Sequence, residues 1–259
     1  MPRRPIQALK KIPGFTIGIV IGLWLTAPVF ASEVRIAVAA NFTEAAREIG
    51  AAFEQTTGHR VVFSFGSTGQ FYTQIAQGAP FEVFLAADRA RPARAVAEDL
   101  AMPGSQFTYA TGRIVLFSRE KDLVSGGETL HAKPFTRLAI ANPNTAPYGA
   151  AAVETMRALG IYDALVGKLV RGNNIAQTYQ FVDTRNAELG FVALSQIVRH
   201  DEGSRWLVPE ALYSPIAQDA VLLPEGASNE AAVAFLSYLK SPEANAVKQK
   251  FGYGPGDWP

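Results

Sequence analysis

The chain has 259 residues, no cysteine, three histidines, and 24 basic residues against 23 acidic ones, which gives a formal net charge of +1. The lack of cysteine excludes disulfides, thiolate metal sites and cysteine nucleophiles. With 48% hydrophobic and 18% charged residues, the composition is that of a globular protein. A near-neutral chain lacks the basic stripe of a nucleic-acid-binding protein, and three scattered histidines predict no site for a bare metal cation.

The first 31 residues differ in composition from the rest. Four basic residues precede an apolar run from Ile12 to Phe30, and Val29-Phe30-Ala31 places small residues at the −3 and −1 positions of a cleavage site. This order is typical of a secretory signal peptide, and it predicts export to the periplasm. The alternative is a retained membrane anchor, which Pro13 and three glycines in the run disfavour. Without residues 1–31 the chain keeps 20 basic and 23 acidic residues, a net charge of −3.

The mature chain then alternates strands and helices. Short apolar runs bounded by polar residues predict the strands, and apolar residues at helical spacing predict the helices. The first strands are predicted at 34–39, 60–65 and 82–87, and the helices that follow them at 41–55, 69–77 and 90–100. This β-α-β-α-β-α order predicts a mostly parallel sheet.

The pattern restarts after residue 110. Strands are predicted at 113–118, 138–141, 169–172, 189–194 and 217–222, and helices at 149–159, 162–169, 175–187, 195–200 and 229–239, with a last helix from Pro242. We therefore expect two α/β lobes with the second inserted into the first. The expected bounds are 32–110 with 216–259 for lobe 1 and 111–215 for lobe 2.

Four helix starts share one chemistry. Each follows a strand and is rich in small or polar residues: the segments begin at Ala40, Gly66, Asn142 and Gly172, and none contains lysine or arginine. Asn41 is expected to cap its helix, with Glu44 completing a capping box. In open α/β sheets ligands bind where strand ends meet helix starts, and the free N–H groups of helix N-termini suit anions. The alternative is that these are simply well-capped helices.

Longer stretches carry a specific resemblance. AVAANFTEAAREIGAAFEQTTGH and FSFGSTGQFYTQIAQGAPFEVFLAAD, followed by NPNTAPYGAAA, ELGFVALSQI and FGYGPG, resemble the periplasmic molybdate-binding proteins of the ModA family. The resemblance covers nearly all of residues 34–254. It implies a type II periplasmic-binding-protein fold, α/β with two lobes that close on one tetrahedral oxyanion. It also implies delivery of molybdate or tungstate to the permease subunits of an ABC importer, by a monomer without a cofactor.

The same resemblance implies the binding residues. The family's oxyanion donors correspond to Ala40 and Asn41, to Ser67 and Thr68, and in the second lobe to Tyr148 and the backbone N–H of Ile175. Some relatives instead place a tyrosine at the position of Ala193 and a small residue at that of Tyr148. This chain resembles the branch in which Tyr148 makes the contact. Asn41 stands where other relatives have serine.

Other functions are weighed against this one. A receptor for a different oxyanion such as sulfate, or for a small organic acid, is possible in the same fold, but an organic acid normally requires an arginine that the four segments lack. A hydrolase or transferase would need a nucleophile with a base in reach. No histidine and no carboxylate pair occurs in these segments, so the sequence does not predict an enzyme.

Overall fold

The computed structural model describes residues 1–2, 31–132 and 134–256. The predicted signal peptide at residues 1–31 therefore lies almost wholly outside the described residues. Among those that are described, no helix has the length and apolar character needed to cross a membrane.

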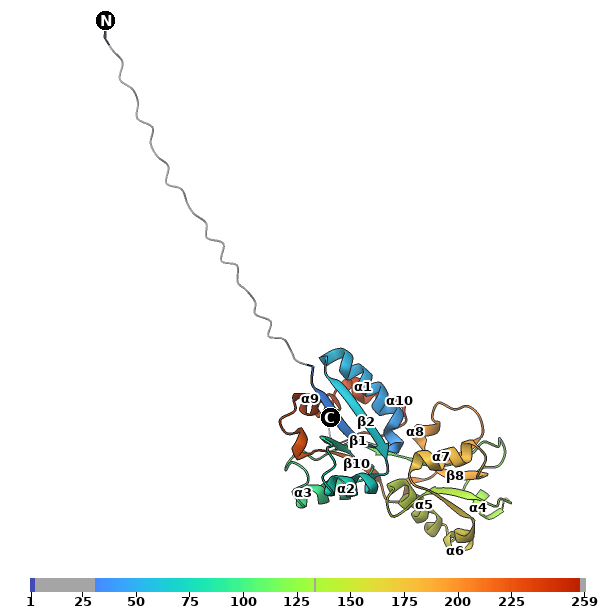
Figure 1. The fold of residues 1–259 in the computed structure, drawn as a ribbon. Helices are drawn as coiled ribbons and strands as arrows, with labels where there is room; N and C mark the ends of the chain where they lie inside the picture. Colours follow the sequence, from blue (N-terminus) through green and yellow to red (C-terminus); the bar gives the residue numbers. More distant parts are fainter. Residues whose placement is uncertain (3–30, 133, 257–259) are drawn as a thin grey trace.

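One five-stranded sheet organises the first lobe, at the left of Figure 1. Its strand order is β2-β1-β3-β10-β4. The strands are β1 (Glu33–Ala39), β2 (Arg60–Gly66), β3 (Val83–Leu85), β4 (Phe107–Gly112) and β10 (Ile216–Leu222). The helices are α1 (Thr43–Thr57), α2 (Thr68–Ala76), α3 (Ala90–Ala97), α9 (Glu230–Tyr238) and α10 (Pro242–Lys250), with 3₁₀ turns η1 (Ala40–Phe42) and η4 (Pro224–Gly226).

A second five-stranded sheet organises the second lobe, at the right of Figure 1, in the order β7-β6-β8-β5-β9. The strands are β5 (Ile114–Ser118), β6 (Leu138–Ala141), β7 (Leu169–Gly172), β8 (Leu189–Ala193) and β9 (Ser204–Leu207). The helices are α4 (Thr129–Ala132), α5 (Pro147–Ala158), α6 (Tyr162–Leu165), α7 (Ile175–Asp183) and α8 (Leu194–Ile197), with 3₁₀ turns η2 (Val166–Lys168) and η3 (Glu210–Leu212).

The two-lobed α/β architecture confirms the predicted fold class, but the sheets are mixed rather than mostly parallel. In each, two strand pairs are parallel and two are antiparallel. The antiparallel pairs arise because the chain enters the second sheet directly from β4 and returns to the first through β10, without the helical crossover that a parallel pair requires.

Each sheet is covered by helices on both faces, and the alternation of its side chains shows how. Val34, Ile36 and Val38 of β1 join a core with α1, α9 and α10, whereas Ala37 between them packs with α2 and α3. In β5, Ile114 and Leu116 face a core with α5, and the intervening residues face one with α7. Because strand side chains alternate between faces, apolar residues at every position produce a sheet buried on both sides.

Two strands were not predicted. The expected boundary between the lobes, after residue 110, falls inside β4, and no strand was predicted over β9. β4 is separated from β5 by Arg113 alone, so no turn signal divides the two strands in the sequence. The chain thus passes from one sheet to the other within a single residue.

The C-terminal helices contribute to the first core, and this can be tested at Phe235 of α9. Its ring is fully buried and makes edge contacts with Phe53 and Phe63. We expect Phe235→Ala to lower the free energy of unfolding by about 3–5 kcal/mol, measured by urea denaturation. Val233→Ala on the same helix is the control, because Val233 is 50% exposed. Equal losses in the two variants would contradict this packing.

Candidate functional site

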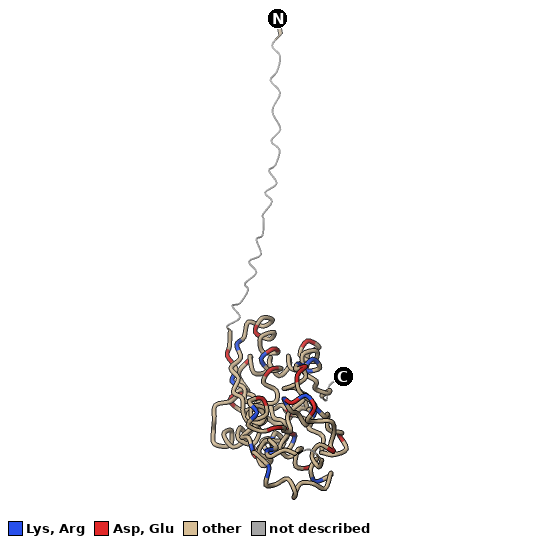
Figure 2. Tube along the Cα trace, turned by 90° about the vertical axis from the view of Figure 1, so that its right-hand side faces the viewer, with Lys and Arg blue, Asp and Glu red and all other residues tan. Residues whose placement is uncertain are grey.

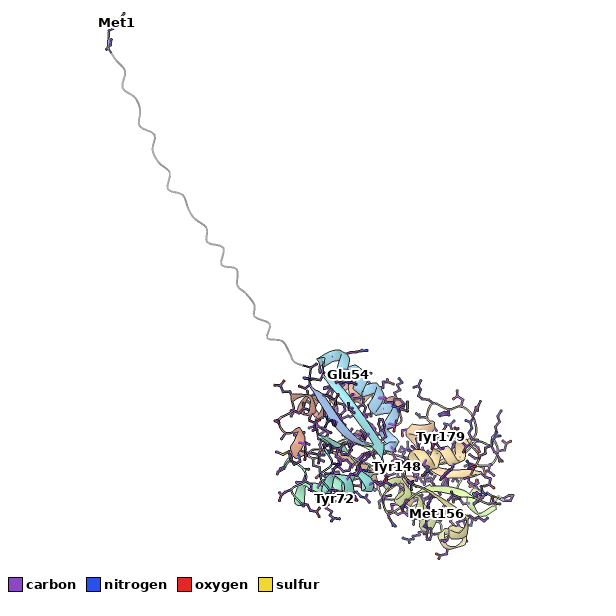
Figure 3. All side chains as sticks on the ribbon, viewed as in Figure 1. Met1, Glu54, Tyr72, Tyr148, Met156 and Tyr179 are labelled. Atoms are coloured by element: carbon purple, nitrogen blue, oxygen red, sulfur yellow. The ribbon has the colours of Figure 1, made fainter. Side chains whose placement is uncertain are left out.

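The carboxyl ends of β1, β2 and β7 meet the N-termini of η1, α2, α5 and α7 around one small cavity of about 10 Å³ between the lobes. This volume is below the usual range for organic ligands. The residues that line it are Ala39, Ala40, Asn41, Gly66, Ser67, Thr68, Ala87, Ala146, Pro147, Tyr148, Asn174 and Ile175. In Figure 3, Tyr148 lies at the junction of the two lobes.

The structure brings all the predicted site residues together at this cavity: Ala40, Asn41, Ser67, Thr68, Tyr148 and Ile175. Sequence reasoning missed Ala87, which follows β3 at the same edge of the sheet. Its N–H donates to Thr68 Oγ1 at 3.0 Å. Ala87 could have been predicted from its position after a buried strand, since the carboxyl ends of parallel strands lie at one edge of the sheet, where ligands bind.

The Ser67 hydroxyl carries the clearest mark of a binding group. Ser67 is 3% exposed, and its Oγ has no hydrogen-bond partner within the described part of the chain. Ser67 is the N-cap of α2 but makes no side-chain cap bond. A buried hydroxyl without a partner loses free energy relative to water, so this group is available to a ligand.

Backbone N–H groups add further donors. Thr68 is the first residue of α2, Tyr148 the second of α5 and Ile175 the first of α7. Such N–H groups have no acceptor within their own helix, and no other acceptor takes them up among the hydrogen bonds of the described residues. The three helix N-termini also direct the positive ends of their dipoles toward the cavity.

Asn41 has a different role from the one predicted. It does not cap α1: the N-cap is Phe42, with no side-chain cap bond, and η1 precedes the helix. The Asn41 amide instead donates from Nδ2 to Gln218 Oε1 at 2.8 Å and to the Tyr253 hydroxyl at 3.1 Å. The capping-box prediction was therefore wrong, because a buried acceptor on β10 takes the side chain away from the helix end.

Tyr148 connects the lobes. From α5 its hydroxyl accepts long hydrogen bonds from Asn41 Nδ2 at 3.5 Å and Gln218 Nε2 at 3.4 Å, both in the first lobe. Burial raises the pKa of Tyr148 well above its usual value. The phenol therefore stays neutral and keeps its proton throughout the physiological range.

The cavity is electrically neutral. None of its lining residues is lysine, arginine, aspartate or glutamate, although charges of both signs are dispersed over the rest of the described chain (Figure 2). The described residues also contain no group of three or more side chains able to hold a metal ion. Neutral donors without facing carboxylates suit an anion and disfavour a cation.

The lobes also touch at the rim of the cavity. Gly69 N–H of α2 donates to the Thr145 carbonyl at 2.8 Å, and Arg91 Nη2 donates to the Asn144 carbonyl at 2.8 Å. Arg91 is held in place by an ion pair with Asp88. A Cβ on Gly69 would lie 2.9 Å from Thr145 Cα, so glycine permits this approach of the two backbones. These contacts define a closed arrangement of the lobes.

The chain is similar to known solute-binding proteins. A family model described as "Bacterial extracellular solute-binding protein" matches residues 34–254. The chain is 54% identical over 237 residues to the molybdate-binding protein ModA of Rhodobacter capsulatus, covering 92% of this chain and 93% of that protein. It is 53% identical over 228 residues to the protein of the same name from Azotobacter vinelandii, with coverages of 86% and 90%.

A solved structure shows the same fold. The periplasmic molybdate-binding protein of Azotobacter vinelandii superposes with a TM-score of 0.83 at 37% identity, covering 85% of this chain and 98% of that one.

The buried phenols predict how stability depends on pH. Burial raises the pKa of Tyr148 and Tyr109, whereas in the unfolded chain both ionise near pH 10. As pH rises through about 10 the unfolded state loses these protons first, so the free energy of unfolding falls; below that pH the phenols cause no such dependence. We expect Tyr148→Phe to fall less steeply than wild type in urea denaturation between about pH 8 and about pH 11. Equal slopes would mean that Tyr148 ionises in the folded state as easily as in water.

Proposed function

Because the chain belongs to the ModA family of bacterial extracellular solute-binding proteins, we propose that it captures molybdate as a tetrahedral dianion between its lobes and delivers it to an ABC importer. The observation that carries this proposal is the buried, unpartnered Ser67 hydroxyl in a neutral cavity whose other groups are helix N-termini. The protein is a transport receptor and not an enzyme.

We assign the ligand contacts to six residues. Ser67 and Thr68 supply hydroxyls, and Ala40, Asn41, Thr68, Tyr148 and Ile175 supply backbone N–H groups at the start of η1, α2, α5 and α7. For Tyr148 we assign the N–H, because it lies in the first turn of α5 and meets no acceptor among the described residues, whereas the hydroxyl lies against Asn41 and Gln218 of the first lobe. Ala193, at the end of β8, is fully buried and has no side-chain donor.

Neutral donors can supply enough free energy to bind the anion. A charge-assisted hydrogen bond contributes roughly 1.5–3 kcal/mol, so about six would offset the desolvation of the anion and the closing of the lobes. A micromolar to nanomolar dissociation constant corresponds to about 8–12 kcal/mol. Tungstate shares the size and charge of molybdate and is expected to bind too, whereas the smaller sulfate would form longer and weaker hydrogen bonds in a rigid cavity.

The remaining assignments follow from the same role. The relatives include a periplasmic protein, and we place this chain in the periplasm as a monomer after removal of residues 1–31. The sheet topology, in which β1–β4 share one sheet with β10 and β5–β9 form the other, supports the expected lobes 32–110 with 216–259, and 111–215, with the first boundary moved to Gly112, where β4 ends.

The function is tested by calorimetric titration of residues 32–259, stripped of bound anion, with molybdate, tungstate, sulfate and phosphate. We expect one-to-one binding of molybdate and tungstate with sulfate and phosphate silent. Binding of sulfate as tight as that of molybdate would reject the proposed selectivity, and no molybdate binding would reject the function.

Ser67→Ala separates binding from folding. We expect it to weaken molybdate binding by about 1–3 kcal/mol, the contribution of one donor to a charged acceptor, in the same titration. The melting temperature of the ligand-free protein should not fall, since the Ser67 hydroxyl has no protein partner to lose. Ser237→Ala, at an exposed position of α9, is the control. Unchanged molybdate affinity in Ser67→Ala would refute this assignment.

Gly69→Ala tests closure. Alanine favours a helix over glycine, so the first lobe keeps its stability, but the added Cβ would meet Thr145 in the closed arrangement. We expect molybdate to bind about tenfold more weakly or worse, with faster dissociation in stopped-flow measurements. Gly167→Ala is the matched control, because a Cβ there meets no atom within 4 Å. Equal affinities of the two variants would show that the Gly69 contact does not limit closure.

A further inference from the structure

Gln218 is a fully buried polar residue just behind the cavity. It lies on β10, between β3 and β4 of the first sheet, and has no exposed surface. The register of β10 against β4 shifts between Gln218 and Asp219, which pair with Ala110 and Thr108 and leave Tyr109 as the extra residue of β4. A β-bulge of this kind redirects a side chain, and bulges are frequent beside functional sites.

The Gln218 amide uses both of its ends. Oε1 accepts from Asn41 Nδ2 at 2.8 Å and from the Tyr109 hydroxyl at 3.2 Å, whereas Nε2 donates to the Tyr148 hydroxyl at 3.4 Å. Asn41 belongs to the first lobe and Tyr148 to the second, and both line the cavity. Gln218 itself does not line it. One side chain therefore links a cavity residue of each lobe from behind.

Gly112 leaves room for the Tyr148 hydroxyl. A Cβ on this last residue of β4 would lie 2.1 Å from the Tyr148 hydroxyl oxygen and 2.7 Å from Gln218 Nε2. The hydroxyl from the second lobe thus enters a slot of the first lobe that exists only because residue 112 has no side chain. The slot and the amide are independent features that place the same oxygen atom.

We propose that Gln218 is a positioning residue that sets the molybdate affinity: its amide orients Asn41 and receives the Tyr148 hydroxyl when the lobes close. The inference rests on the proposed function, since molybdate is the ligand whose binding it tunes. An amide suits this place because it is neutral and is at once donor and acceptor. A carboxylate of the same shape would put a negative charge directly behind the site of a dianion.

The test compares Gln218→Met and Gln218→Glu with the matched control Gln106→Met. Gln106 also bonds into β10, through Asp219 at 2.6 Å, but contacts neither Asn41 nor Tyr148 in the described structure. By calorimetry, Gln218→Met should bind molybdate about tenfold more weakly, as for one lost hydrogen bond, while Gln106→Met keeps the wild-type affinity. Gln218→Glu retains the shape of the side chain and the acceptor for Asn41, so it serves if Gln218→Met does not fold. Its molybdate affinity should rise as the pH falls, because the carboxyl then becomes protonated and neutral. A purely structural role would not produce that pH profile.

A second measurement needs no ligand. In ligand-free protein the melting-temperature changes of Gln218→Met and Tyr148→Phe should be less than additive, because both remove the same contact. Wild-type molybdate affinity in Gln218→Met, or a pH-independent affinity in Gln218→Glu, would overturn the inference. If the wild-type protein binds no molybdate, the proposed function is overturned. The contact between Gln218 and Tyr148 is then judged by the melting temperatures alone, and additive changes would overturn it as well.

Discussion

The cavity between the lobes offers hydrogen-bond donors and no countercharge, and the rest of the structure follows from that constraint. A neutral donor contributes less than a charged one, so binding a dianion requires several donors. Several helix N-termini therefore have to converge, and each must follow a strand that ends near the same point. One sheet can direct only some of them to a point. Two sheets that face each other across a cleft, with η1 and α2 on one side and α5 and α7 on the other, supply the full set. An arginine would bind any anion more simply but would admit carboxylates too.

The neutral site depends on a second layer that is polar yet uncharged. Asn41, Tyr148, Tyr109 and Gln218 are buried and bond to one another in a network. Such a network stabilises a single arrangement only if every member finds a partner. Burial raises the pKa of the tyrosines, as it does for Tyr253, and so protects the network from acquiring a charge near the anion. The β-bulge in which Tyr109 is the extra residue of β4, beside Gln218, lies within this network.

Local patterns in the sequence were enough for most of the fold and for the location of the site. The four helix starts were recognisable because each stands where an apolar strand gives way to a helix, and the family resemblance then indicated Ser67, Thr68 and Ile175 within them. The direction of the Asn41 side chain was not recognisable, since asparagine serves equally well as a helix cap and as a buried amide. Its partner Gln218 is 177 positions away, and nothing nearby in the sequence marks it. β4 escaped prediction because Arg113 alone separates it from β5, and neighbouring strands in different sheets look like one long apolar run.

A receptor must also release what it binds, and the contacts between the lobes reflect this. At the rim they consist of backbone carbonyls of Asn144 and Thr145 that accept from Arg91 and Gly69. Such bonds exchange readily with water, and a net hydrogen bond stabilises by only about 1 kcal/mol. At the rear the Tyr148 bonds are long. Ser195 Oγ also donates to the Asn41 carbonyl at 2.8 Å, so a small number of hydrogen bonds joins the lobes, and a bound dianion that takes donors from both would add to them. The protein can then close on its ligand and still open to release it.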